Sequence, residues 1–254
     1  MIKSLNNAIL LVLTLCTFGT TANAQDAPCA SLQDQQALDC AMSALDIYVP
    51  QINNVRWRDQ SLREQAKILV RKGDVQKAIA LISQITNADT QALTIRAIGI
   101  GMKDLTLDDA QKTLYFDALH KHAAAITHTG SQEIALTYIA IAEASTGLFQ
   151  NALKTASKLE TRSLRNKSYQ EIAEVLSATH KSDDAFFALE RIDDTAFKNK
   201  AYSVVAAVFI KHQHITNALK ATDFIDDPYI KSSSLLHIIN TAELPAAKKQ
   251  TVQK

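Results

Sequence analysis

The stretch ERIDDTAFKNKAYSVVA, residues 190–206, has a near copy 33 residues later, where DFIDDPYIKSSSLLHII occupies residues 223–239. Each stretch contains an apolar residue, two adjacent aspartates, a short bridge, a lysine and then an apolar run. Self-similarity at a fixed period of this length is typical of helical repeat proteins. Two questions follow: whether the whole chain is a repeat array, and whether the aspartate pairs are catalytic or structural.

The repeat extends over most of the chain when the sequence is aligned on four alanines, Ala78, Ala152, Ala185 and Ala218. The last three are 33 residues apart, and the gap of 74 residues before them is two periods plus eight residues. Three further positions agree: a bulky residue sixteen before each alanine, a small residue twelve before it and an aliphatic residue seven after it. They are Leu62, Leu136, Tyr169 and Tyr202, then Ala66, Ala140, Ala173 and Ala206, and finally Ile85, Leu159, Ile192 and Ile225.

Within each unit the apolar residues recur at helical spacing, which indicates two short helices per unit. Glycine and proline are scarce, with 6 and 4 residues in the chain, and this also favours helix over sheet. The sequence therefore predicts an all-α solenoid of about 4–5 helix pairs.

Nine residues after each reference alanine stands a residue that can cap a helix, namely Asn87, Thr161, Asp194 or Asp227. The side-chain oxygen of such a residue accepts a backbone N–H of the first helical turn. We therefore predict that these four residues are structural helix caps, and that the second aspartate of each pair is one of them. A catalytic pair would need carboxylates facing each other across a cleft, whereas equivalent positions of a solenoid lie along one edge, roughly 10 Å apart.

The bulky, small and alanine positions together resemble the tetratricopeptide repeat, a helix–turn–helix unit, over roughly residues 59–242. The period is 33 rather than 34, an Ile or Leu replaces a second small residue, and the usual proline near the end of the unit is absent. The resemblance implies a right-handed α/α superhelix in which the first helix of each unit lines a concave surface.

Residues 1–24 have the features of a signal peptide: Lys3, the apolar stretch Ala8–Gly19 and the small residues Ala22–Ala24. We expect cleavage near Ala24 and a periplasmic or secreted protein, in which Cys29 and Cys40 form a disulfide. Eleven residues along one helix separate Cα atoms by roughly 16 Å, too far for a bridge. Cys29 must then lie on a segment that folds back over the helix carrying Cys40.

The expected domain organisation follows from these signals. An N-terminal helical cap with the disulfide spans residues 25–58, the repeats span 59–242, and a flexible C-terminal tail spans 243–254. The eight extra residues fall in an irregular unit at about 99–131, which contains a long helix with Thr106 as its N-cap.

Little in the sequence indicates chemistry. Without Lys3, 26 basic residues stand against 26 acidic ones, whereas a nucleic-acid-binding protein usually has a basic excess. His120 and His122 point about 200° apart on a helix, and His212 and His214 lie at a turn without clustered ligands, so we expect neither metal nor cofactor. G-x-S-x-G is absent and Gly99-x-Gly101 lacks the third glycine of a nucleotide loop, so we expect no enzyme.

One charged stripe is a candidate binding surface. Arg63, Lys67 and Arg71 are spaced by four and therefore share one face of a helix. By the resemblance this face turns inward and could bind an acidic peptide or another anion; the alternative is a solvated charged face. The equivalent face of later units is mixed in charge and includes Lys167, Gln170, Glu174 and Lys200.

The sequence thus favours an exported, non-catalytic protein or peptide interaction scaffold of the cell envelope, without a membrane span and of open oligomeric state. Two alternatives remain: an accessory module in peptidoglycan or envelope processing, and a small-ligand binder or enzyme with a site in the concave groove.

Overall fold

A computed structural model describes residues 29–247 of the chain, with side chains described as far as residue 242. Helices account for the regular structure, and residues 29–247 contain no strand. The chain divides into two compact units, of which the first ends at Ile47 and the second begins at Tyr48. The expected N-terminal cap, residues 25–58, extends past this division, and its last residues belong to the helix that begins at Val55. The expected signal peptide, residues 1–24, lies outside the described residues.

The first unit contains a short 3-10 helix, η1 (Cys29–Ser31), and all of α1 (Asp34–Tyr48) except its last residue. A disulfide joins Cys29 to Cys40 with the two Cα atoms 5.6 Å apart. Cys29 lies on η1, before the helix, so the chain turns back over α1 to bring the two sulfurs together. The predicted disulfide and its fold-back geometry are confirmed.

The second unit alternates long and short helices, with one exception. Two 3-10 turns, η2 (Val49–Gln51) and η3 (Ile82–Gln84), accompany them. The α-helices are α2 (Val55–Arg71), α3 (Val75–Leu81), α4 (Ala88–Met102), α5 (Asp109–Ala124), α6 (Thr129–Ser145), α7 (Phe149–Ser157), α8 (Arg162–Ala178), α9 (Ser182–Glu190), α10 (Thr195–Lys211), α11 (Ile215–Asp223) and α12 (Pro228–Ala247). The exception is α5 (16 residues), which is about as long as α4 (15 residues).

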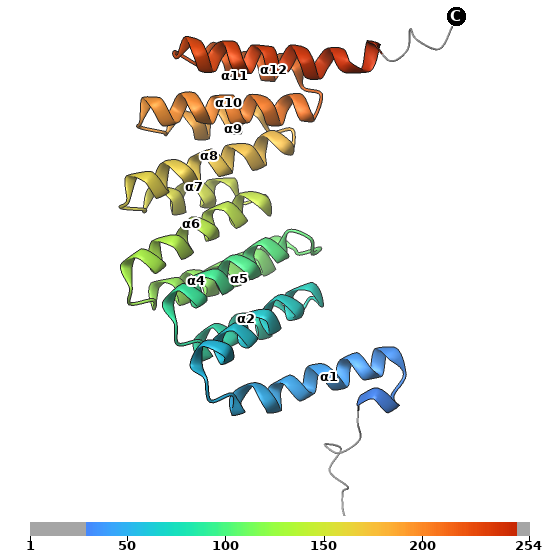
Figure 1. Ribbon diagram of the computed structural model, residues 1–254. Coiled ribbons are helices and arrows are strands. Elements are labelled where there is room, and N and C mark those ends of the chain that lie inside the picture. The colour runs from blue at the N-terminus through green and yellow to red at the C-terminus, as the bar shows by residue number, and fades with distance from the viewer. Residues whose placement is uncertain (1–28, 248–254) are drawn as a thin grey trace, which may run out of the picture. The chain divides into compact units, whose positions relative to one another are not determined.

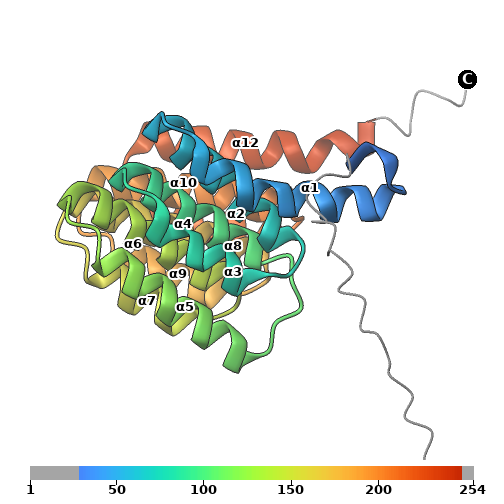
Figure 2. The same ribbon diagram turned by 90° about the horizontal axis from the view of Figure 1, so that it is seen from below.

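These helices form two layers. The even-numbered helices pack on one another in chain order, α2 on α4 and so on to α12, and we call this row the first layer (Figures 1 and 2). The odd-numbered helices α3 to α11 form the second layer, and each packs on first-layer neighbours. The structure thereby confirms the all-α, repeat-like architecture that the sequence period predicts.

The reference alanines explain the close approach of the two layers. Ala78, Ala152, Ala185 and Ala218 are all completely buried in second-layer helices. Leu119 occupies the same position in α5: it too is completely buried, and it precedes the buried Ile126 by seven residues. The eight extra residues therefore lie before Leu119, in the α4–α5 connection and the first turns of α5, and the register is regular again after them.

The irregular unit differs from the prediction in its helix start. Asp108, not Thr106, is the N-cap of α5, and it forms a capping box with Gln111. The Gln111 backbone N–H donates to the Asp108 carboxylate at 2.7 Å, and the Gln111 side-chain oxygen accepts the Asp108 N–H at 3.0 Å. The reciprocal pair satisfies two backbone groups, which Thr106 with Asp109 would not do as well.

Three of the four predicted caps accept the expected hydrogen bond. Asn87, Asp194 and Asp227 accept the backbone N–H of the residue three positions on, at 2.9, 2.8 and 2.8 Å. Thr161 occupies the N-cap position of α8, but its side chain makes no capping bond. Its hydroxyl instead donates to the Glu133 carboxylate of the preceding long helix.

That bond belongs to a second recurring feature, a polar side chain five residues after the N-cap of a long helix. It accepts a backbone N–H from the turn that begins the next unit, and we call this contact the junction bond. The acceptors and donors are Asp59 and Asn87 (2.8 Å), Glu133 and Thr161 (2.9 Å), Asn166 and Asp193 (3.4 Å), and Asn199 and Asp226 (3.0 Å). In α4 the position is Ala92, and Asp89 of the same helix instead accepts the Ser131 hydroxyl at 2.5 Å.

The C-terminal end of the second unit is more helical than expected. α12 continues to Ala247, so residues 243–247 belong to a helix rather than to the predicted tail, and residues 248–254 lie outside the described part. Among the described helices, none combines the length and apolarity that a membrane span requires.

Candidate functional site

The predicted partner-binding residues all lie on first-layer helices, but they do not form one cluster. α2 carries Arg63, Lys67 and Arg71, whereas Lys167, Gln170 and Glu174 lie on α8 and Lys200 lies on α10. Because α4 and α6 separate α2 from α8, the structure divides these residues into two groups along the row.

The group on α2 lines a hollow of about 450 Å³ between α2 and α4, which we call the basic hollow. Three cationic side chains of α2 lie on one side, and α4 with its C-terminal turn supplies the rest of the lining: Leu93, Arg96, Ala97, Ile100, Gly101 and Asp104. Leu93 and Ile100 give it an apolar part beside the charged rim. Sequence spacing alone predicted the α2 stripe; Arg96 and the apolar residues join it only through helix packing.

The charges of the basic hollow are partly paired. Glu64 accepts hydrogen bonds from Lys67 at 2.8 Å and from Arg63 at 2.9 Å. The Lys67 hydrogen bond, assisted by Arg63, overcomes the opposing effect of burial and lowers the pKa of Glu64. The Arg96 guanidinium lies over the Tyr138 ring, 4.7 Å from its centroid.

Arg71 differs from its neighbours, because it is exposed and no described residue pairs with it. Four cations and one carboxylate, Asp104, line the hollow, and Glu64 pairs with two of the cations, so the lining carries net positive charge. A hollow of this kind favours an anionic ligand.

The second group is largely self-paired. These pairs lie within α8. Lys167 Nζ lies 3.5 Å from Glu171 Oε1, and the Gln170 side-chain amide donates a hydrogen bond to the Glu174 carboxylate at 2.7 Å. Lys200 is exposed on α10. This part of the first layer offers a ligand less uncompensated charge than the basic hollow.

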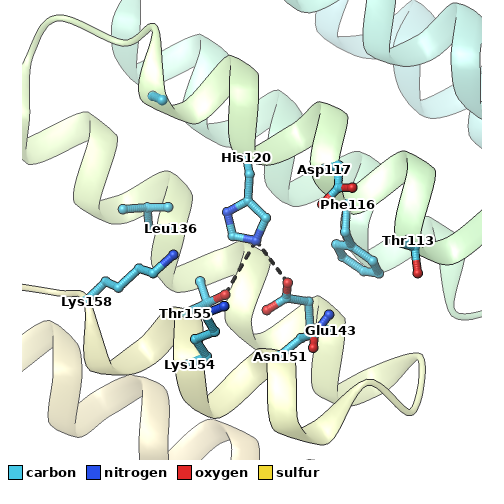
Figure 3. Close-up of a pocket in the computed structure, with 11 residues that line it drawn as sticks. Thr113, Phe116, Asp117, His120, Leu136, Glu143, Asn151, Lys154, Thr155 and Lys158 are labelled. Carbon is cyan, nitrogen blue, oxygen red and sulfur yellow. Dashed lines mark hydrogen bonds and ion pairs between the residues drawn. The ribbon is translucent and has the colours of Figure 1, made fainter.

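A second hollow, which the sequence reasoning missed, lies between α5, α6 and α7 (Figure 3). It has a volume of about 420 Å³, and we call it the histidine pocket. Its lining residues are Thr113, Phe116, Asp117, His120, Ala124, Leu136, Glu143, Asn151, Lys154, Thr155 and Lys158. The sequence placed His120 on a helix without assigning it a partner, and in the structure its Nε2 lies 2.9 Å from the buried Glu143 Oε1.

The pocket is not arranged as a nucleophilic triad. Thr155 Oγ1 lies 3.4 Å from the same His120 nitrogen that contacts Glu143. In a Ser–His–acid site the nucleophile and the acid use different ring nitrogens. Among the described residues no group of three His, Cys, Asp or Glu side chains is placed to hold a metal ion.

No protein-family model, curated protein or solved structure matches this chain. The geometry of the two hollows and the features of the sequence are therefore the basis for the function.

Proposed function

We propose that the protein is an exported, non-catalytic interaction scaffold of the cell envelope, and that its basic hollow binds an acidic, partly apolar segment of a protein partner. The observation that carries this proposal is the hollow itself: cations in excess, an Arg71 that pairs with none of the described residues, and Leu93 and Ile100 beside them. The signal-peptide features of residues 1–24 and the Cys29–Cys40 disulfide support an oxidising compartment outside the cytoplasm.

We further propose that the repeat is tetratricopeptide-like, a right-handed α/α superhelix of about 4–5 helix pairs whose first layer forms the concave face. The pairing of a long with a short helix in every unit but that of α4 and α5, and the recurrent buried alanines, support this assignment. Stacked units of this kind present an extended surface without any catalytic residue.

The chemistry of the hollow suits a peptide with alternating carboxylate and apolar side chains. A guanidinium can bind a carboxylate through two parallel hydrogen bonds, and Arg71 and Arg96 bring two guanidinium groups to the same hollow. Because the charges lie near the surface, salt should weaken the binding.

The proposal is tested by the fluorescence anisotropy of a labelled peptide that alternates glutamate and leucine. Arg71→Ala should weaken binding about tenfold, equivalent to about 1.4 kcal/mol, because it removes the unpaired cation. Lys77→Ala is the matched control, since Lys77 is an exposed cation of α3 in the second layer and should leave the affinity unchanged. Equal affinity of the Arg71 variant, or equal binding of a lysine–leucine peptide, contradicts the proposal.

A further inference from the structure

Glu143 of the histidine pocket occupies a position that is apolar in every other described unit. It is the fifteenth residue after the N-cap of its long helix, His128. The fifteenth residues after the N-caps of α2, α4, α8 and α10 are Leu69, Met102, Leu176 and Phe209, and each is buried. In α12, the last helix, the fifteenth residue is the exposed Ala242. Glu143 is equally buried, with 1% of its surface exposed. A carboxylate therefore occupies a position that holds a buried apolar side chain in α2, α4, α8 and α10.

His120 is the second substitution of this kind. It directly follows Leu119, which holds the reference position of α5, and the residues that follow the four reference alanines are Ile79, Leu153, Phe186 and Leu219. The His120–Glu143 pair thus replaces two apolar residues; the corresponding residues of α9 and α10, Phe186 and Phe209, lie with their ring centroids 5.7 Å apart. Such a replacement commonly lowers stability, because removing a carboxylate from water costs more than its new contacts return. Packing does not account for the pair.

The pair also leaves hydrogen-bonding capacity unused. Glu143 Oε1 interacts with His120, but no described residue bonds Oε2, although that atom is shielded from solvent. A buried carboxylate oxygen without a partner is costly unless a ligand or water satisfies it. His120 is 28% exposed, so turning the imidazole outward uncovers the carboxylate.

The other charged residues that line the pocket include both an acidic side chain and basic side chains. Asp117 lies on α5 one turn before His120, whereas Lys154 lies on α7 and Lys158 is the C-cap residue of that helix. In Figure 3, Asp117 and Lys158 lie on opposite sides of the pocket, with Glu143 between them. Phe116 and Leu136 supply apolar surface.

We propose that the histidine pocket binds a small zwitterionic amino compound. The ammonium group hydrogen-bonds to Glu143 and faces Asp117, the carboxylate faces Lys154 and Lys158, and the short aliphatic part contacts Phe116 and Leu136. This site is separate from the basic hollow and uses other helices, so either site can fail without the other.

Titration calorimetry of the full chain with three probes tests the proposal: γ-aminobutyrate, butyrate, which lacks the ammonium, and butylamine, which lacks the carboxylate. Only the zwitterion should bind measurably at millimolar concentration. Glu143→Leu, which restores the residue type of the other units, should abolish this binding and raise the melting temperature by about 2–4 °C. Lys158→Ala, at the exposed rim, should weaken binding about tenfold without changing the melting temperature, and Lys181→Ala outside the pocket should change neither.

The proposal is overturned when no probe binds, when butyrate or butylamine binds as tightly as γ-aminobutyrate, or when Glu143→Leu retains the affinity of the wild type. Lys158→Ala keeps the test decisive even where the Glu143 variant does not fold, because Lys158 is exposed and packs in no core. Unchanged affinity of the Lys158 variant also contradicts the proposal.

Discussion

At the scale of single residues, the aspartate pairs join one unit to the next. In the first pair, Asp194 caps α10, while Asp193 pairs with Arg162 and Arg165 at 2.9 and 3.1 Å. Hydrogen bonds from Arg162 and then Asn166 hold the pKa of Asp193 far below its usual range. In the second pair, Asp227 caps α12 and the Asp226 backbone donates to Asn199. Neither pair faces another carboxylate across a cleft.

The strongest junction bond gives the first prediction at this scale. The buried Glu133 carboxylate accepts the backbone N–H groups of Glu160 and Thr161, at 2.6 and 2.9 Å, and the Thr161 hydroxyl. Glu133→Gln removes the charge that strengthens these bonds and should lower the free energy of unfolding at neutral pH by about 2 kcal/mol. Glu171→Gln, which weakens only a surface ion pair on α8, should change it by less than about 0.5 kcal/mol.

The same variant has a pH signature. Burial acts to raise the pKa of Glu133, but the hydrogen bonds from Thr161 and Glu160 outweigh it, and the pKa lies below its ordinary value of 4.5. The stabilisation is therefore complete above pH 4.5 and is lost as the pH falls through the lower folded value. Urea unfolding at several pH values should show that the difference in free energy of unfolding between the wild type and the glutamine variant shrinks in acid. A difference that stays constant with pH would contradict this account.

At the scale of elements, α4 shows how close packing selects residues. Gly99 and Gly101 lack the context of a nucleotide loop, and the structure supplies another reason for them. A Cβ atom on Gly99 would lie 2.7 Å from the Ala142 Cβ of α6, and one on Gly101 would lie 2.5 Å from a Val70 methyl of α2. The two glycines let α4 approach both first-layer neighbours.

Gly99→Ala should therefore destabilise the protein, although alanine normally favours a helix by about 1 kcal/mol. The clash with Ala142 is with a short side chain that cannot move aside, and overpacking of this kind costs about 1–3 kcal/mol. Ser233→Ala on the exposed face of α12 is the control and should be neutral or slightly stabilising. Chemical denaturation measures the free energy of unfolding of both variants. If Gly99→Ala stabilised the protein, α4 and α6 would have to lie farther apart than the 2.7 Å contact implies.

At the scale of the whole molecule, the features that could be predicted from the sequence are those that depend on local chemistry or on the repeat period. The buried alanines follow from the period, and the Asn87, Asp194 and Asp227 caps follow from the preference of short polar side chains for helix starts. The junction bonds were not predicted, because Glu133 and Thr161 meet only through tertiary packing. Insertion of eight residues concealed the equivalence of Leu119 with the alanines. Once Leu119 is aligned with the alanines, His120 is seen to be a polar residue at a position that is apolar in the other units. In the same way, the sequence could have singled out Glu143, because the equivalent residues of other units are apolar, for example Leu69 and Leu176.

The two compact units should respond independently to reduction. α1 contains no buried residue, and an isolated helix of 15 residues is marginal in water, so the disulfide stabilises the first unit. Reduction should increase hydrogen exchange in residues 34–47 while the protection of α4 to α10 stays unchanged. The Cys40→Ser variant should reproduce this pattern without reductant. Loss of protection throughout the chain would show that the repeats depend on the first unit.

The central claim is that the basic hollow is the partner-binding surface, and an NMR titration of the isotope-labelled protein with the glutamate–leucine peptide tests it most directly. The account predicts backbone shift changes concentrated around Arg63, Lys67 and Arg71 of α2 and Arg96 and Ile100 of α4. In Arg71→Ala the same changes should need a peptide concentration about tenfold higher. Shift changes concentrated on α8 and α10, or spread over the second layer, would contradict it.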